Sequence, residues 1–434
     1  MISLQPTPYS SFVCPVCQSE NQTVTGTILQ GIHWLAEVKC ADCATDYLAD
    51  FPTGHALFFP GSWISEKNQW KLKTEFEAPW FQKPVSAGFA NPRPEVVSVK
   101  RIQKRHFKQV ILLNCLDYLY GHVLLKLWNA HSHLQEQPSF GLIVMIPESF
   151  EWLVPEGVAE IWSIPLKLKD CQQYFPSINI QIQQWISEYE TVKLSLAHSH
   201  PDPAELPVQN YTGVSPFPVT EFCSRPPVIT FIYREDRLWL SNQMQDFAWM
   251  LATKYQLQSI KQYLLSVQKS QILAYFETIH AINPQIEIRI TGLGQAGGFP
   301  VYVKDLRKTR LTAQDEKDWC VCYAESQLVV GIHGSNMLLP TAHAAGFIEI
   351  LPKARWGNLM QDIASRNQGR ILHFLGRFTE EFISPKQLAI LTTEIFRQYP
   401  FFELSMDKRF LEHSMVSDVS LWTGFRKKYI PQNK

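Results

Sequence analysis

The hydrophobic pattern of residues 328–352 predicts a strand, a tight loop, a helix and a second strand. Residues 328–330 are an apolar run short enough for a buried strand, and residues 331–336 (GIHGSN) form a turn of small and polar residues. Residues 337–345 can continue as a helix, and residues 347–351 are again apolar. This is the pattern of a βαβ-like unit.

The same alternation of apolar runs and helical spans recurs in both halves of the chain. In the N-terminal half we expect strands at 110–113, 141–146 and 158–164 and a helix at 123–134. In the C-terminal half we expect strands at 228–233, 286–290 and 370–375 and helices at 243–252, 259–281 and 312–325. Strands separated by helices imply parallel sheets, so the fold class is α/β with two Rossmann-like domains.

Composition indicates a folded protein without a pronounced charge. A chain of 434 residues suggests two or three domains. Lys+Arg and Asp+Glu both number 40, so the overall charge does not point to nucleic acid or a membrane surface. No apolar stretch reaches the roughly 20 residues of a membrane-spanning helix, and the first residues lack a basic region followed by an apolar one. We therefore expect a cytoplasmic protein with no transmembrane segment.

Four of the nine cysteines form two C-x-x-C pairs, Cys14/Cys17 and Cys40/Cys43, separated by 22 residues. Each pair can place two thiolates on one metal, and four thiolates suit tetrahedral Zn²⁺. The spacer is rich in β-branched and aromatic residues, which favours strands. The pattern predicts a zinc ribbon whose metal is structural, because four thiolates leave no open position. His33, within the spacer, is expected to be a strand residue and not a fifth ligand.

The charge of the predicted ribbon argues against nucleic-acid binding. Between residues 11 and 60 Lys39 is the only Lys or Arg, whereas five residues are acidic. An acidic module is a poor partner for phosphate backbones. We expect the ribbon to be a docking or capping module that could receive a protein partner.

A stretch with seven prolines, residues 198–227, separates the two α/β halves and reads as an interdomain linker. The predicted organisation in chain order is therefore as follows: zinc ribbon 1–60, connecting segment 61–105, N-terminal Rossmann-like acceptor domain 106–200, Pro-rich linker 201–227, C-terminal Rossmann-like donor domain 228–400 and C-terminal extension 401–434.

The motif G-x-H-G-S-N-x-L at residues 331–338, followed by F-I-E-I-L-P, resembles the nucleotide-binding segment of GT-B glycosyltransferases, particularly glycosyltransferase family 61. The resemblance covers about 25 residues clearly. Ser335 departs from the family pattern, where Ala is usual, and 336–337 stand where Gly-Leu is usual. The resemblance implies a nucleotide-sugar donor and inverting chemistry.

Two arginines follow the predicted strand 228–233 and are expected to bind the donor. Guanidiniums at the carboxyl end of a strand can hold a diphosphate bidentately and without a metal. Arg234 and Arg237 are therefore candidate donor-binding residues, and the same segment resembles the start of the donor domain in family 61. The alternative is a surface ion-pair cluster with Glu235 and Asp236.

The loop of the opening segment supplies the other candidate donor-binding residues. Gly334 lets the backbone approach a ligand, and Ser335 or Asn336 is a suitable N-cap for a helix whose N-terminus favours phosphate. The family resemblance implies that His333 touches the donor phosphate or sugar and that Glu349 bonds to the nucleotide. The alternatives are an ordinary capped βα turn and a salt-bridged Glu349.

The loop after the predicted strand 110–113 holds the candidate catalytic residues. Ligands of open parallel sheets sit beyond the carboxyl ends of the strands, where Asp117 and His122 follow Asn114. Either could act as the general base towards an acceptor hydroxyl. The alternatives are helix capping by Asp117 and a hydrogen-bonded core position for His122. Asn114, Tyr118 and Leu119 also resemble part of an N-Y-x-H-W-L-x-D-like motif of family 61, but Asp117 stands roughly where that motif has its His.

Residues 292–297 match the dinucleotide fingerprint G-x-G-x-x-G, but they do not support a dehydrogenase. That fingerprint must open a helix, whereas residues 301–303 are strand-like. We interpret the segment as a glycine loop.

The combined prediction is a metal-independent glycosyltransferase that moves a sugar from a nucleotide-diphosphate sugar to a glycan or other hydroxyl acceptor. No D-x-D pair stands at a strand end to hold a catalytic metal. The alternative is a catalytically inactive GT-B-like scaffold that binds partners through its zinc ribbon.

Overall fold

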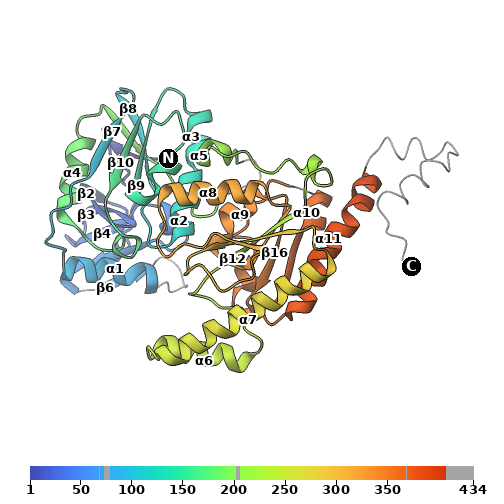
Figure 1. Ribbon diagram of the computed structural model, residues 1–434. Coiled ribbons are helices and arrows are strands. Elements are labelled where there is room, and N and C mark those ends of the chain that lie inside the picture. The colour runs from blue at the N-terminus through green and yellow to red at the C-terminus, as the bar shows by residue number, and fades with distance from the viewer. Residues whose placement is uncertain (68, 73–78, 202–205, 368, 407–434) are drawn as a thin grey trace, which may run out of the picture. The chain divides into compact units, whose positions relative to one another are not determined.

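A computed structural model describes the chain except for residues 68, 73–78, 202–205, 368 and 407–434 (Figure 1). The chain divides into two compact units, Met1–Gly213 and Val214–Lys434, and the division falls inside the segment predicted as a linker. Most of the predicted C-terminal extension lies outside the described residues. Within the described ranges, no helix combines the length and apolar character needed to span a bilayer.

The N-terminal unit contains a six-stranded sheet in the order β1-β11-β8-β9-β10-β7. Its four central strands are parallel, and β1 and β7 pair antiparallel at the two edges. The strands are β1 (Ile2–Gln5), β7 (Lys100–Gln103), β8 (Gln109–Asn114), β9 (Gly141–Pro147), β10 (Glu160–Ile164) and β11 (Thr191–Leu194). The helices of this unit are α1 (Pro79–Ala90), α2 (Tyr120–Trp128), α3 (Ala130–Glu136), α4 (Pro176–Ile186) and α5 (Gln209–Thr212).

A second, antiparallel sheet of the same unit carries the two cysteine pairs. Its order is β2-β3-β4-β5-β6. The strands are β2 (Gln22–Gln30), β3 (His33–Cys40), β4 (Asp46–Asp50), β5 (Gly61–Ile64) and β6 (Gln69–Leu72). The boundary predicted at residue 60 therefore falls inside a sheet, because β5 and β6 continue it. The strands predicted between the cysteine pairs are present as β2 and β3.

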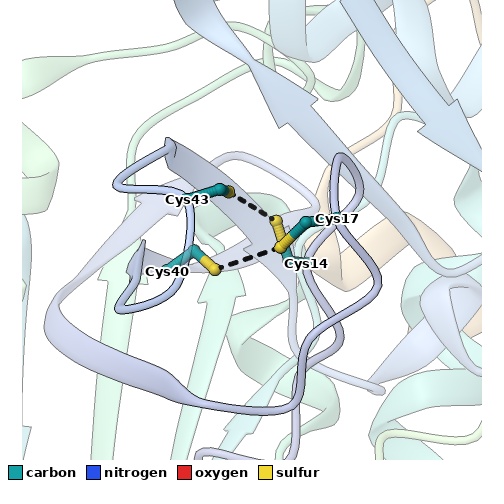
Figure 2. Close-up of side chains that lie close together, drawn as sticks. All are labelled: Cys14, Cys17, Cys40 and Cys43. Carbon is teal, nitrogen blue, oxygen red and sulfur yellow. Dashed lines mark hydrogen bonds between the residues drawn. The ribbon is translucent and has the colours of Figure 1, made fainter.

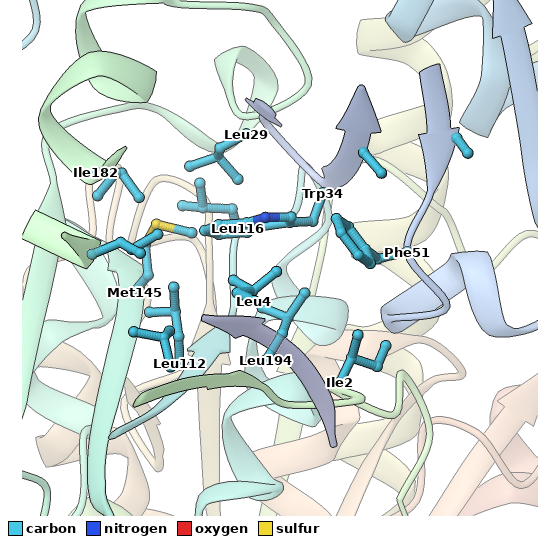
Figure 3. Packing of buried hydrophobic residues seen from close by; sticks show 14 of the residues in the cluster. Ile2, Leu4, Leu29, Trp34, Phe51, Leu112, Leu116, Met145, Ile182 and Leu194 are labelled. Atoms are coloured by element: carbon cyan, nitrogen blue, oxygen red, sulfur yellow. The ribbon is translucent and has the colours of Figure 1, made fainter. Parts of the chain in front are cut away.

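One hydrophobic core joins the two sheets of the N-terminal unit (Figure 3). Trp34 from β3 and Phe51 after β4 pack with Leu112 and Met145 of the parallel sheet and with Ile182 of α4. Trp34, Phe51, Leu112 and Met145 are each at most 1% exposed. Burial of such large apolar side chains stabilises the fold by roughly 1.5–3 kcal/mol each, so the cysteine-bearing sheet is packed as part of this unit.

The C-terminal unit is built on a parallel six-stranded sheet in the order β14-β13-β12-β15-β16-β17. The strands are β12 (Val228–Tyr233), β13 (Glu287–Gly292), β14 (Val303–Asp305), β15 (Leu328–Ile332), β16 (Gly346–Leu351) and β17 (Gly376–Glu380). Counted along the chain this order is 3-2-1-4-5-6, the doubly wound order of dinucleotide-binding Rossmann folds. Successive strands lie first on one side of β12 and then on the other.

Helices cover both faces of this sheet because its strands are apolar on both faces. The helices are α6 (Gln243–Lys254), α7 (Gln258–Ile282), α8 (Ala313–Ala324), α9 (Leu338–His343), α10 (Gly369–Leu375) and α11 (Pro385–Met406). Phe231 and alternate strand residues face α7 and α11, whereas the neighbouring Ile232 packs with Trp319 of α8 (Figure 1). The predicted α/β fold class with two Rossmann-like units is confirmed.

Two local predictions are wrong. Residues 369–375, expected as a strand over 370–375, form α10, and the strand is the following β17. A short apolar run does not distinguish a strand from a buried helix turn. The helix expected at 337–345 is shorter, a 3₁₀ turn over Ser335–Met337 followed by α9, and neither Ser335 nor Asn336 is its N-cap.

Candidate functional site

The candidate donor residues lie where the C-terminal sheet changes its winding direction. This point is between β12 and β15, the place where open α/β sheets bind ligands. The parallel register pairs Ile232 with Gly331, so Arg234 and His333 emerge level with each other beyond the two strands. Glu349 on β16 is paired with Gly331. Strand register therefore brings residues about 100 positions apart to one edge.

Arg234 is fixed by hydrogen bonds on two sides. Its Nε and Nη2 donate to Asp236 at 2.8 and 2.5 Å, and its Nη1 donates to Asn336 Oδ1 at 2.6 Å. The ion pair considered as an alternative for this segment is therefore present, but the same guanidinium also contacts the predicted loop. Arg234 orients Asn336, and five donors in a planar fork allow both contacts at once.

Most hydrogen-bond donors of the Arg237 guanidinium have no partner in the described part of the chain. Its Nη1 donates to the His333 carbonyl, and no other hydrogen bond from its guanidinium is present within the described ranges. Burial, followed by the neighbouring charges of Arg234 and Arg355, lowers the pKa of Arg237 to about 10. The carboxylates of Asp236 and Asp362 act in the opposite direction without cancelling the shift, so a further anion near Arg237 would raise its pKa.

Gly334 allows the loop to pass against both arginines. Its φ of 151° and ψ of 175° lie in a region that is essentially restricted to glycine. A Cβ at this position would lie 2.5 Å from Arg234 Nη1 and 3.0 Å from Arg237 Nη1. The backbone conformation of Gly334 therefore agrees with the sequence-based argument that this residue permits a close approach. The groups that approach it are the guanidiniums of Arg234 and Arg237.

His333 and Glu349 form a hydrogen-bonded pair that is fully buried. Burial holds the pKa of Glu349 well above its ordinary value, and burial also lowers the pKa of His333. Both shifts favour a neutral pair, in which the Glu349 carboxyl donates to His333 Nδ1 and the imidazole proton is on Nε2. That Nε2 lies 3.6 Å from Asp362 Oδ2.

Two buried donors of this loop have no hydrogen-bond partner in the described part of the chain, His333 Nε2 and Asn336 Nδ2. A buried donor without a partner costs about 1–3 kcal/mol, so their clustering beside Arg237 indicates a surface built for acceptor oxygens. Ser335 is half-buried at the start of the 3₁₀ turn.

Sequence reasoning missed two charged residues of this site, Arg355 and Asp362, and considered Asp236 only as part of an alternative surface ion-pair cluster. Asp236 holds Arg234, and Arg355 and Asp362 act electrostatically on Arg237 and His333. Arg355 and Asp362 follow β16 along the chain. A search of the residues beyond the predicted strand 347–351 could have found Arg355 and Asp362.

In the N-terminal unit, Asp117 is completely buried and both of its carboxylate oxygens are used. Oδ1 accepts from the Leu119 N–H and lies 3.2 Å from His122 Nδ1. Oδ2 accepts from Lys126 Nζ at 2.8 Å and lies 3.3 Å from His55 Nε2. A carboxylate has about four acceptor positions, so Asp117 has none left for a substrate proton. Asp117 is therefore placed to orient its hydrogen-bond partners.

The electrostatics of Asp117 agree with this geometry. Burial by itself would raise the pKa of Asp117, but Lys126 and the hydrogen bonds from His122 and His55 hold it well below the ordinary value. His122, by contrast, has a side chain 20% exposed, and its Nε2 makes no hydrogen bond in the parts of the chain that the structure describes. Between the two candidates, His122 is therefore the one with a ring nitrogen free to contact a substrate.

His55 and Lys126 complete this cluster and were not predicted. His55 comes from the segment assigned to the ribbon, and burial lowers its pKa to about 4. No sequence signal connects it to Asp117. Lys126 offered a signal, because a lysine on an otherwise apolar helix face requires a carboxylate partner when buried.

His55, Asp117 and His122 offer ligand atoms within 4.8 Å of one another, a spacing that could hold a metal ion. The Lys126 ammonium, 2.8 Å from Asp117, opposes this. Two unit charges at 4 Å interact by about 4 kcal/mol at an effective dielectric constant of 20, and the repulsion doubles for a dication. One carboxylate already balanced by an ammonium is a weak cation site. We refer to His55, Asp117, His122 and Lys126 as the Asp117 cluster.

The four cysteines of the two C-x-x-C pairs converge as predicted (Figure 2). Cys14 Sγ lies 3.6 Å from Cys43 Sγ, and Cys17 Sγ lies 3.5 Å from Cys40 Sγ. A tetrahedral zinc with Zn–S bonds of about 2.3 Å requires sulfur–sulfur separations of about 3.8 Å. The cluster therefore fits a metal ion with only a small expansion.

The two knuckles have matching backbones. The residue after each second cysteine, Gln18 or Ala44, has a left-handed φ near 60°. Each also donates its N–H to the carbonyl of the first cysteine of its pair. His33 is not a ligand: it lies in β3, and its ring nitrogens contact Asp50 and the Phe81 carbonyl at 2.8 and 2.7 Å.

The G-x-G-x-x-G segment does not open a helix. Gly292 ends β13, and the loop that follows leads into β14. Arg307 and Asp305 hold this loop, since the Gly297 N–H donates to Asp305 at 2.7 Å and Arg307 donates to the Gly297 carbonyl at 2.9 Å. The rejection of a dinucleotide fingerprint is supported by this geometry.

No protein-family model matches this chain. No curated protein sequence matches it either. Among solved structures, E. coli ADP-heptose lps heptosyltransferase II has 11% identity and a TM-score of 0.37, covering 67% of this chain and 100% of that chain. E. coli heptosyltransferase WaaC with ADP has 14% identity and a TM-score of 0.37, covering 66% of this chain and 100% of that one. Such low similarity carries no argument, and the placement in family 61 stays a prediction.

Proposed function

We propose that the chain is a glycosyltransferase that uses a nucleotide-diphosphate sugar. The observation that carries this proposal is the convergence of Arg234, Arg237 and the His333–Asn336 loop at the winding switch of a 3-2-1-4-5-6 sheet. That position is where such sheets hold nucleotides. The guanidiniums and the two donors without a hydrogen-bond partner, His333 Nε2 and Asn336 Nδ2, match the oxygens of a diphosphate.

The donor residues have separate tasks in this proposal. Arg237, with free donors, binds the diphosphate, and Arg234 orients the Asn336 amide towards it. As the bond between the sugar and the diphosphate breaks, its electron pair stays on the phosphate oxygen. Fixed positive groups stabilise that developing charge. Glu349 fixes the tautomer of His333 so that Nε2–H can donate to the donor.

The N-terminal unit supplies acceptor activation. His122 takes the proton of the acceptor hydroxyl on Nε2, and the acceptor oxygen forms the new bond to the anomeric carbon. Asp117 orients the ring by accepting from Nδ1 and stabilises the imidazolium that results. Direct attack of this kind inverts the anomeric configuration. No step needs a metal, so activity is expected to persist in EDTA during short assays.

Zn²⁺ is proposed as the metal of the cysteine cluster, with a structural role. Four thiolates close the coordination shell, so the ion supplies folding energy and no chemistry. Metal analysis of the purified protein tests this: about one zinc per chain is expected. A chain without bound metal, or with iron, would contradict it.

The donor site is tested by thermal shift with UDP, GDP, ADP and CMP and their sugars. One nucleotide class should raise the unfolding midpoint, because a ligand that binds only the native state stabilises it by mass action. Arg237→Ala should abolish the shift, whereas Arg397→Ala, which removes an exposed ion pair on α11, should retain it. No shift with any nucleotide would refute the donor site and favour the inactive scaffold.

Catalysis is tested separately by release of nucleotide from the stabilising donor. Turnover, with or without added acceptor, supports an enzyme. His122→Gln should lower the rate about 10²–10⁴-fold while leaving the nucleotide-induced thermal shift intact. Binding without any turnover would instead support a scaffold that retains only the donor fold.

A further inference from the structure

A large groove of the N-terminal unit lies at the carboxyl ends of its parallel strands. The groove has a volume of about 780 Å³, within the range of small-molecule sites. One wall is α1, and the others are formed by Tyr118, after β8, and by residues 169–173, after β10. This is the end of the sheet at which α/β folds bind ligands.

The lining combines ring faces with positive charge. Trp80 and Tyr118 present aromatic surface, and Lys83, Arg93 and Lys169 are the charged residues among the twelve that line the groove, with no acidic residue among them. Arg93 pairs with Glu95 at 3.1 Å. Lys83 and Lys169 have no ion pair within the described ranges. The net charge of the groove is therefore positive.

The groove lining also includes the side-chain amides of Gln172 and Gln173. Gln173 Oε1 is buried without a partner in the described structure, while its Nε2 donates to Asp170 at 3.3 Å. An apolar ring face beside amides suits the C–H face and hydroxyls of a sugar ring, because buried polar groups need partners. The lysine and arginine side chains of the groove then favour sugars that carry an anionic group.

Aromatic contacts connect the groove to the Asp117 cluster. The Trp80 ring centroid lies 5.0 Å from that of His55 and 6.3 Å from that of Tyr118. The Tyr118 ring is in turn 6.5 Å from the His122 ring. A saccharide stacked in the groove would thus have one end near His122, whose Nε2 makes no hydrogen bond in the described part of the chain.

We infer that this groove binds the acceptor and that the acceptor is an anionic saccharide, carrying a carboxylate or a phosphate. The inference rests on the proposed function, since it names the substrate class of the acceptor side. The basic segment at residues 101–108 is a weaker candidate for an anion site, because Arg101 binds Glu160 and Glu188 and Lys108 binds Glu190.

The test is titration calorimetry of the full chain with three probes. Tetragalacturonate carries carboxylates, mannose 6-phosphate carries a phosphate, and cellotetraose is neutral. Tighter binding of either anionic probe than of cellotetraose is expected, with an affinity that falls as salt rises. Which of the two binds more tightly identifies the anionic group. Equal binding of all three, or no binding, overturns the inference.

Variants separate the contribution of charge from that of stacking. Lys83→Gln and Lys169→Gln should each weaken the anionic probe about tenfold and leave cellotetraose unchanged. Trp80→Ala should weaken all saccharides alike. Lys304→Gln, an exposed lysine on β14 of the other unit, is the matched control and should change nothing.

The outcome is distinguishable from failure of the proposed function. The nucleotide-induced thermal shift depends on the C-terminal unit, so it should persist in Lys83→Gln and Lys169→Gln. Saccharide binding without any nucleotide shift would refute the donor site alone. Loss of the nucleotide shift in the groove variants would show that the groove holds the nucleotide and would overturn the inference.

Discussion

Gly334→Ala should weaken nucleotide binding at the donor site. The residue has φ 151° and ψ 175°, and an L-residue held there costs of order 1–3 kcal/mol. The new Cβ would lie 2.5 Å from Arg234 Nη1, where an ordinary contact needs about 3.4–4 Å. The arginine must therefore move by almost 1 Å.

Arg234 cannot move without losing its own partners. It donates to Asp236 at 2.5 and 2.8 Å and to Asn336 at 2.6 Å, and each charge-assisted hydrogen bond contributes about 1.5–3 kcal/mol. Loss of one such bond to the nucleotide corresponds to about a 10–100-fold weaker Kd. At a ligand concentration of 100 wild-type Kd the stabilisation should fall from about 2.7 kcal/mol to about 0.4–1.4 kcal/mol.

The assay is nucleotide-dependent thermal unfolding, with urea unfolding to measure the stability of the unliganded protein. Gly369→Ala is the matched control, because Gly369 has φ 56° but a Cβ there meets no atom within 4 Å. It also places an alanine at a positive φ but lacks the clash, so its nucleotide response should be retained. If folded Gly334→Ala binds nucleotide as tightly as the wild type, the loop is not at the diphosphate and the reasoning fails.

Three further predictions concern the N-terminal unit. Cys17→Ser should release the metal and lower the unfolding temperature, whereas Cys223→Ser, at an exposed cysteine, should do neither. Metal analysis after gel filtration measures the bound metal in both variants. A full metal complement in Cys17→Ser would contradict the metal site. Lys126→Met should destabilise the fold by about 3–5 kcal/mol, because it leaves the buried Asp117 charge uncompensated. Urea unfolding measures this loss, and adding Asp117→Asn in a double variant should recover much of it. If the effects of the two substitutions simply add, Lys126 and Asp117 are not energetically coupled and the prediction is wrong. The pKa of His55 is about 4 in the folded state and about 6.5 in the unfolded state, so between these pH values the unfolded state binds one more proton. The free energy of unfolding should therefore fall by up to about 3 kcal/mol as pH drops from 6.5 to 4. His55→Gln should remove this part of the pH dependence, and an unchanged pH dependence would refute a buried neutral His55.

The sequence by itself was sufficient for the elements whose signals are local. Two C-x-x-C pairs predict one four-sulfur cluster, because each knuckle is formed by neighbouring residues and the metal imposes the rest. Apolar runs such as 228–233 and 328–330 predict buried strands by length and composition. The placement of Arg234 and His333 at strand ends follows from the same pattern. A short apolar run such as 370–375 was ambiguous, because local periodicity does not separate a helix turn from a strand.

Only the tertiary structure decided which distant residues meet. The pairing of Ile232 with Gly331 sets Arg234 beside His333, and no local signal fixes that register. Likewise His55 reaches Asp117, 62 positions away, because the cysteine-bearing sheet packs on the same core as the parallel sheet. The roles of Asp117 and His122 depend on burial and on the count of donors around one carboxylate. Burial and the number of donors are properties of the packed structure, and the sequence alone does not specify them.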